Sequence, residues 1–283
     1  GGRNAFAETY GAHRMMLALH YSDHVQLCKY AHAQGLQFVE TICSRMALEL
    51  LMNAGLEPDY IKLASRDLSN TPLVDMMAET KLPLILSTGM SSFQDIAETV
   101  ERICKVHRNI TVLHCTSTYP ARYDELDMVT LHSYAKQWGD IAIGYSDHTT
   151  GVLAPAIAVA CGAQVVEKHI TLHHSMKGTD HAGSMDHEGL YRVVRDIRNT
   201  EKALGKSRTQ PPITTDVAKG KLARSCALKW PMVAGTTITE ESLCLLSPGT
   251  GIPWSERDRI IGRQLKCDIK RHELVKQEDV TNG

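Results

Sequence analysis

The chain has 283 residues, of which 43% are hydrophobic, and its formal net charge is -1. This length suits one large domain, or one with a small appendage, and the hydrophobic share excludes a disordered protein. The longest apolar runs stop well before ~18 residues, and residues 1–4 do not resemble a signal peptide, so we expect no membrane partner. The near-zero net charge gives no electrostatic argument for a nucleic acid partner.

The 8 cysteines are scattered along the chain and form no CxxC pair. This pattern is typical of reduced thiols, and it predicts a cytoplasmic location. Cys115 stands beside apolar residues, so we interpret it as a buried structural thiol rather than a nucleophile.

From residue 22 onward the pattern alternates between helices and strands. We expect Ser22 to cap a first helix over residues 23–33, which ends at Gly35. Further helices are predicted at 44–54, from 71, and at 93–106, 131–138, 152–161 and 187–204, and strands at 36–41, 60–65, 83–88, 110–116, 142–145 and 165–169.

Alternation at this spacing predicts βα units and a parallel sheet. About six such units precede Gly205, whereas a complete TIM-type (β/α)8 barrel has eight units in ~250 residues. Residues 1–21 hold no apolar strand that could supply the other two. We therefore predict an α/β fold in which residues 1–205 form a TIM-type barrel domain that lacks its first two βα units in this chain.

The composition changes after Gly205. Residues 206–221 are mostly polar and include two adjacent prolines, which predicts a linker. Residues 222–283 hold short apolar segments and a Pro-Gly-Thr-Gly turn, so we expect a small compact domain near the lower size limit for independent folding.

The stretch from Gly144 to Ser184 places a histidine after each of two consecutive strands, His148 and His169. Active sites of parallel barrels lie at these strand ends, and two imidazoles there can share a divalent cation. Asp147, Glu167 or Asp180 could add oxygen ligands or support the ligands. The alternative is two histidines in ordinary polar loops, and spacing alone leaves both interpretations open.

Several short motifs, in order along the chain, carry a resemblance to a known family. The chain resembles the sialic acid synthases, that is, N-acetylneuraminate synthases and their legionaminic and pseudaminic acid relatives, and its C-terminal part resembles their antifreeze-like SAF (β-clip) domain. The motifs are Thr9-Tyr10-Gly11, Lys62-Leu63-Ala64-Ser65, Leu86-Ser87-Thr88-Gly89-Met90, His114-Cys115-Thr116-Ser117-Thr118-Tyr119-Pro120, residues 144–149, Glu167-Lys168-His169 and Lys177-Gly178-Thr179-Asp180-His181.

The resemblance implies a metal-assisted condensation of phosphoenolpyruvate with N-acetylmannosamine or a related N-acyl hexosamine and water. The products are a nine-carbon 2-keto sugar acid and phosphate, which makes the protein a transferase that forms a C–C bond. Carried over by position, the metal ligands are His148 and His169, and Asp180 is a catalytic acid beside these two histidines. The residues that bind phosphoenolpyruvate are Thr41, Lys62, Ser65, Ser87 and Ser146. The residues that bind the sugar are Asn4, Ser117 and Tyr119.

The chemistry explains the residue types. Phosphoenolpyruvate brings about three negative charges into a partly dry pocket, so a lysine and several hydroxyl donors must offset its lost hydration. Mn²⁺, or otherwise Mg²⁺, suits an oxygen-rich substrate held beside two imidazoles, and Mn²⁺ is the preferred expectation. Asp67 is a further acid–base candidate, although it could equally cap the turn before Thr71.

Three departures from the family pattern favour other hypotheses. The family's first two βα units carry a glutamate, a lysine and a glutamine. They lie upstream of the position of Asn4, so we expect this chain to lack them. Arg66 replaces a usual glycine, where it could contact phosphate or crowd the site, and Ser247 stands where some members have an arginine. The alternatives are a catalytically inactive homologue that still binds phosphoenolpyruvate and sugar, and a barrel metallohydrolase. The family also implies a homodimer with exchanged C-terminal domains.

Overall fold

The computed structural model describes residues 5–206 and 212–281. It divides into two compact units, residues 1–205 and residues 206–283, and each unit is described by itself. Asn4, and residues 207–211 of the predicted linker, lie outside the described residues.

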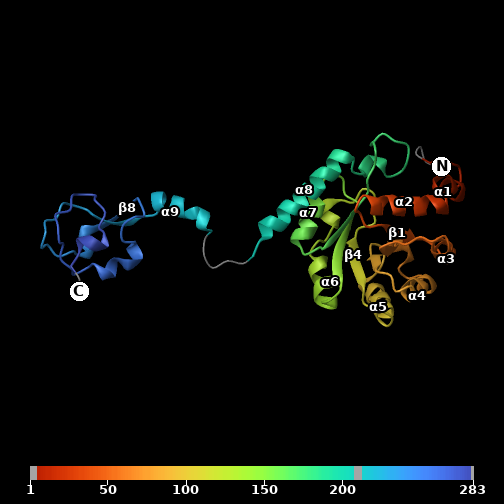
Figure 1. The fold of residues 1–283 in the computed structure, drawn as a ribbon, viewed down its shortest axis with the longest axis horizontal. Coiled ribbons are helices and arrows are strands. Elements are labelled where there is room, and N and C mark those ends of the chain that lie inside the picture. The colour runs from red at the N-terminus through yellow and green to blue at the C-terminus, as the bar shows by residue number, and fades with distance from the viewer. Residues whose placement is uncertain (1–4, 207–211, 282–283) are drawn as a thin grey trace. The chain divides into compact units, whose positions relative to one another are not determined.

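A six-stranded parallel sheet forms the centre of the first unit (Figure 1). Its spatial order is the chain order, so each strand pairs with the next one along the sequence. The prediction of consecutive βα units is confirmed, and the six strands form a TIM-like half-barrel. The strands are β1 (Val39–Ile42), β2 (Tyr60–Leu63), β3 (Leu84–Ser87), β4 (Ile110–Cys115), β5 (Ala142–Asp147) and β6 (Val165–Lys168).

Helices separate the strands and flank the sheet (Figure 1). Their starts follow from local caps: Ser92 and Asp95 form a capping box, and Pro72 occupies the first turn of its helix. The helices are α1 (Tyr10–Leu17), α2 (Tyr21–Ala33), α3 (Arg45–Asn53), α4 (Thr71–Glu79), α5 (Phe93–Cys104), α6 (Thr130–Trp138), α7 (Leu153–Ala160) and α8 (His187–Leu204), with single 3-10 turns at η1 (Ser65–Asp67), η2 (Tyr123–Glu125) and η3 (His181–Gly183).

The start of α2 differs from the sequence prediction. His20, not Ser22, is the N-cap: its imidazole accepts a hydrogen bond from the Ser22 amide, and the Asp23 carboxylate accepts one from the His20 amide. Ser22 therefore lies inside the helix. Helix α1 was also not predicted, because none of its residues is buried and its sequence carries no core-facing pattern.

The core of the first unit lies between the sheet and its helices. All six residues of β4 are buried, as expected for a central strand covered on both faces. Helix α5 buries Ile96, Thr99, Val100 and Ile103, whose i, i+3, i+4, i+7 spacing makes one apolar face. This packing fixes the strands against the helices, so the loops at the strand ends project from a rigid base.

The second unit contains helix α9 (Asp216–Leu222) and an antiparallel pair, β7 (Ser225–Leu228) with β8 (Leu243–Leu246). Among residues 212–281, single-residue bridges and four 3-10 turns complete the unit, and its separate core includes Cys226, Ile238 and Val275. The turns are η4 (Ile213–Thr215), η5 (Glu240–Ser242), η6 (Trp254–Arg259) and η7 (Gln277–Asp279). Across both units, no helix of the described residues is long and apolar enough to cross a membrane.

Gly144 provides a test of strand packing. A Cβ at this position would lie 2.5 Å from both the Leu113 Cδ2 atom and the Val165 carbonyl oxygen. We expect Gly144→Ala to lower the free energy of unfolding by about 1–3 kcal/mol, because the neighbouring strands must move apart. Urea unfolding followed by far-ultraviolet circular dichroism measures this change.

The matched control is Gly11→Ala in α1, where an added Cβ meets nothing within 4 Å. Alanine favours a helix over glycine by up to about 1 kcal/mol, so this variant should be unchanged or slightly more stable. Equal unfolding free energies for the two variants would contradict the packing described for Gly144.

Candidate functional site

Polar side chains from five consecutive strand ends meet in one cavity at the carboxyl edge of the sheet. Parallel strands end at the same edge, which is why residues far apart in sequence gather there. The structure brings together eight of the residues singled out from the sequence, namely Lys62, Ser65, Ser87, Ser117, Tyr119, Ser146, His148 and His169.

Three charged residues line this cavity, Lys62, Arg66 and Glu167, and the side chain of Lys62 is only 12% exposed. Its Nζ lies 3.2 Å from Glu167 Oε1, and Ser87 Oγ donates to Glu167 Oε2 at 3.5 Å. Ser65 Oγ, from the next turn, accepts a hydrogen bond from the Gly89 amide at 3.2 Å. A cation and several hydroxyls thus converge from separate strands, an arrangement suited to a small anion.

Two predicted residues do not join this group. Thr41 pairs in register with Lys62 across β1 and β2, but it is exposed and does not line the cavity. Asp67 faces Arg66, whose Nε lies 3.2 Å from Asp67 Oδ2, and it lines none of the cavities at this edge. Arg66 itself does line the cavity.

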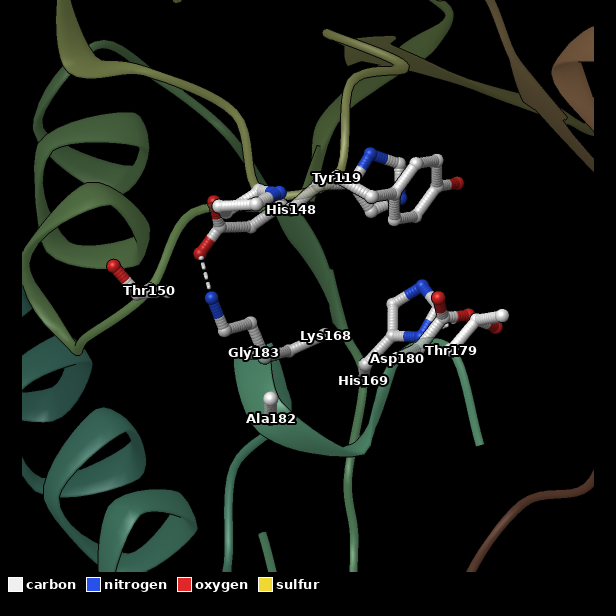
Figure 2. A pocket seen from close by; sticks show the side chains of 11 residues that line it. Tyr119, His148, Thr150, Lys168, His169, Thr179, Asp180, Ala182 and Gly183 are labelled. Carbon is white, nitrogen blue, oxygen red and sulfur yellow. Dashed lines mark hydrogen bonds and ion pairs between the residues drawn. The ribbon is translucent and has the colours of Figure 1, made fainter. Parts of the chain in front are cut away.

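His148 and His169 lie side by side at the ends of β5 and β6 (Figure 2). Their ring centroids are 5.3 Å apart and their planes are inclined by 71°. The Tyr119 ring packs against His148 with centroids 4.2 Å apart and meets His169 edge-on at 5.7 Å. The two imidazoles therefore share one space.

The remaining partners orient each imidazole. His148 Nδ1 donates to the Thr116 carbonyl at 2.9 Å, which leaves Nε2 with a free lone pair. His169 Nδ1 lies 3.8 Å from Asp180 Oδ2, and both of these side chains are partly exposed. Asp180 thus lies beside His169 (Figure 2).

The surroundings shift the pKa values of the two histidines in opposite directions. Burial lowers the pKa of His148, but hydrogen bonds to Cys115 and to the Thr116 carbonyl outweigh it and raise the pKa above its ordinary value. The pKa of His169 lies below its ordinary value, first because the ring is buried and then because His148 is a cationic neighbour. Neighbouring titratable groups with diverging pKa values are typical of functional sites.

The imidazole pair fits a divalent cation only in part. Within residues 5–206 and 212–281, no group of three or more His, Cys, Asp or Glu is placed to hold a metal ion. The two rings supply two nitrogen ligands, and the backbone-oriented His148 has the arrangement usual for a metal-ligating histidine. Oxygen atoms of a substrate or water would have to complete the shell, as Mn²⁺ and Mg²⁺ readily allow.

A second cavity shares Tyr119, His148 and His169 with the first. Its other walls include Thr179 and Asp180, together with residues of the loop that ends in η3. The imidazole pair thus stands between two adjoining spaces. Such a site can hold two reactants, one on each side.

Sequence reasoning underestimated Cys115. Cys115 is buried, but its Sγ lies 3.5 Å from Ser117 Oγ and 3.8 Å from both Ser65 Oγ and His148 Nδ1. It is therefore part of the polar wall and not only of an apolar core. A signal was present, because Cys115 ends a strand at the carboxyl edge of the sheet and Ser117 follows two residues later.

The comparisons with known proteins agree with this geometry. The model of the NeuB family matches residues 3–209 and that of the SAF domain matches residues 223–281. A Legionella pneumophila N,N'-diacetyllegionaminic acid synthase is 34% identical over 274 residues, covering 94% of this chain and 76% of that protein. The human N-acetylneuraminate-9-phosphate synthase is 30% identical over 281 residues, covering 99% of this chain and 78% of that protein.

A solved structure shows the same likeness. The N-acetylneuraminic acid synthetase of Leptospira borgpetersenii serovar Hardjo-bovis, in complex with citrate, superimposes with a TM-score of 0.67 at 26% identity. The match covers 75% of this chain and 74% of that chain. The resemblance inferred from the sequence motifs is thereby confirmed for both parts of the chain.

The paired imidazoles predict a metal-dependent stability. Mn²⁺ at about 100 times its dissociation constant should stabilise the protein by about 2.7 kcal/mol. His148→Ala should abolish this effect, because a single remaining imidazole binds the ion weakly. Thermal unfolding with and without MnCl₂ measures the difference. His132→Ala, which removes an exposed imidazole from α6, should be stabilised by Mn²⁺ like the wild type. An equal loss of Mn²⁺ stabilisation in both variants would contradict metal binding by His148 and His169.

Proposed function

Since the chain belongs to the NeuB family, we propose that it is a nonulosonate synthase, which condenses phosphoenolpyruvate with an N-acyl hexosamine. N-acetylmannosamine or a close relative is the proposed acceptor, and water completes the reaction to a nine-carbon 2-keto sugar acid and phosphate. The observation that carries the proposal is the convergence of Lys62, the hydroxyl groups and the imidazole pair on adjoining cavities. The names of the relatives support the reaction class.

The wall formed by Lys62, Ser65, Ser87 and Ser146 is the proposed phosphoenolpyruvate side. Lys62 supplies the positive charge, and it already has a carboxylate partner in Glu167 that holds it toward the cavity. The hydroxyls supply directional hydrogen bonds. Together they replace the hydration that the phosphate and carboxylate groups lose on entering the pocket.

The imidazole pair with Tyr119, Ser117 and Asp180 is the proposed sugar side. Carbon 3 of phosphoenolpyruvate forms a bond to the sugar's aldehyde carbon, water adds at carbon 2, and the C–O bond to phosphate breaks. His148 and His169 would hold a divalent cation, Mn²⁺ by preference or Mg²⁺, which as a Lewis acid stabilises the oxygen that gains negative charge. Asp180, whose carboxylate lies 3.8 Å from His169, would take or give a proton at that oxygen.

Two further properties complete the proposal. The relatives are enzymes with small-molecule substrates, and a cytoplasmic location fits a chain with 8 free cysteines.

We also propose a homodimer with exchanged C-terminal domains, which light scattering can test. A monomeric mass would contradict it.

The direct test is phosphate release from phosphoenolpyruvate in the presence of Mn²⁺ and N-acetylmannosamine, its 6-phosphate or 2,4-diacetamido analogues. We expect turnover with at least one of these sugars and none with phosphoenolpyruvate alone. Hydrolysis of phosphate esters without any sugar would favour a metallohydrolase. Calorimetric binding of both substrates without turnover would favour the inactive homologue.

Arg66 provides a second prediction, because it lines the phosphoenolpyruvate side where the family usually has glycine. A second cation there should strengthen binding of an anion without changing the chemical step. We expect Arg66→Met to raise the KM for phosphoenolpyruvate about tenfold with a nearly unchanged kcat, which is a loss of uniform binding. Steady-state phosphate release measures both constants.

The matched control is Arg108→Met. Arg108 precedes β4 at the opposite edge of the sheet and pairs with Asp140 there, so its loss should leave both constants unchanged. A lower KM for Arg66→Met would instead show that Arg66 crowds the substrate.

A further inference from the structure

A buried ion pair is formed by the two residues that precede the imidazoles in the chain. Lys168 Nζ is 2.6 Å from Asp147 Oδ2, and the side chains are 5% and 0% exposed. Asp147 immediately precedes His148, and Lys168 immediately precedes His169. The pair therefore joins the two strand ends that present the proposed metal ligands.

Both oxygens of the Asp147 carboxylate are fully used as hydrogen-bond acceptors. Besides Lys168, it accepts hydrogen bonds from the Tyr145 hydroxyl at 3.1 Å, the Thr149 amide at 2.9 Å and the Thr149 hydroxyl at 3.2 Å. Lys168 also donates to the Thr149 carbonyl. One carboxylate and one ammonium thus tie β5, β6 and the turn after His148 into a single network.

Stability alone does not account for such a pair. Removing two charges from water is costly, and well-packed apolar residues of similar volume are often as stabilising as a buried ion pair. The network does have one consequence that apolar packing lacks. A hydrogen-bonded ion pair fixes both the distance and the direction between the two backbones that it connects.

The strand register shows that the ion pair fixes the ends of β5 and β6 relative to each other. Asp147 and Lys168 are paired neighbours at the end of the β5–β6 ladder, and the ladder stops there. His148 and His169 follow at once, beyond the β5–β6 pairing, and their backbone carbonyls accept hydrogen bonds from the Ala121 and Met185 amides and not from each other's strand. We propose that Asp147 and Lys168 are positioning residues, whose ion pair holds the ends of β5 and β6 so that both imidazoles face one divalent cation.

This inference rests on the proposed metal-assisted function. Lys168 and Asp147 also line the second cavity, so the competing interpretation is that Lys168 contacts a substrate directly. The two interpretations differ when no substrate is present. A positioning residue affects binding of the metal alone, whereas a substrate-binding residue leaves it unchanged.

The experiment titrates the full chain with Mn²⁺ alone by calorimetry. The variants are Lys168→Met, Asp147→Asn and the double variant, with Arg108→Met as a control that removes an exposed, distant ion pair. We expect Mn²⁺ binding to weaken about 10- to 100-fold in both single variants and in the double variant, as for other residues that orient metal ligands. The control should bind like the wild type.

Thermal unfolding without metal separates positioning from folding. Each single variant leaves one buried charge unpaired and should unfold at a lower temperature, and the double variant should recover part of that loss. If Lys168→Met does not fold, the double variant provides the test. Wild-type Mn²⁺ affinity in a folded double variant would overturn the inference, since the pair would then matter only for stability.

The same measurements separate this inference from the proposed reaction. A wild-type protein that binds no Mn²⁺ overturns the inference, even if phosphate release shows that the synthase reaction occurs. A wild-type protein that binds Mn²⁺ and loses affinity in the double variant supports the inference, even if no sugar tested is turned over.

Discussion

The parallel pairing of β5 with β6 is the constraint on which the site depends. Because the strands run in the same direction and in register, the residues that follow them, His148 and His169, must emerge side by side. Their 5.3 Å separation is thus a consequence of sheet geometry and not of a flexible loop. The buried pair of Asp147 with Lys168 closes the ladder at its last position.

The same constraint distributes the polar groups of the site over two cavities. The earlier strands, β2 to β4, contribute Lys62 and hydroxyl groups to one wall, while the loop after β6 contributes Asp180 to the other. The imidazoles stand between them. An anion on one side and an uncharged sugar on the other match this distribution, because each reactant meets groups that offset what it loses on leaving water.

The sequence predicted the alternating strands and helices well, because period and caps are local signals. It failed where the outcome depends on tertiary context. Helix α1 buries nothing and so leaves no pattern. Thr41 lies beside Lys62, but on the edge strand β1, where it is exposed and does not line the cavity. Two polar partners of Cys115, Ser65 and His148, come from other strand ends, and no sequence spacing encodes that meeting.

The location of Mn²⁺ in a crystal of the protein, found from its anomalous scattering, tests the central claim most directly. The geometry of β5 and β6 predicts one strong peak within coordination distance of a nitrogen of His148 and of His169. A peak held by other residues, or imidazoles that turn away from each other with side chains packed between them, would contradict it.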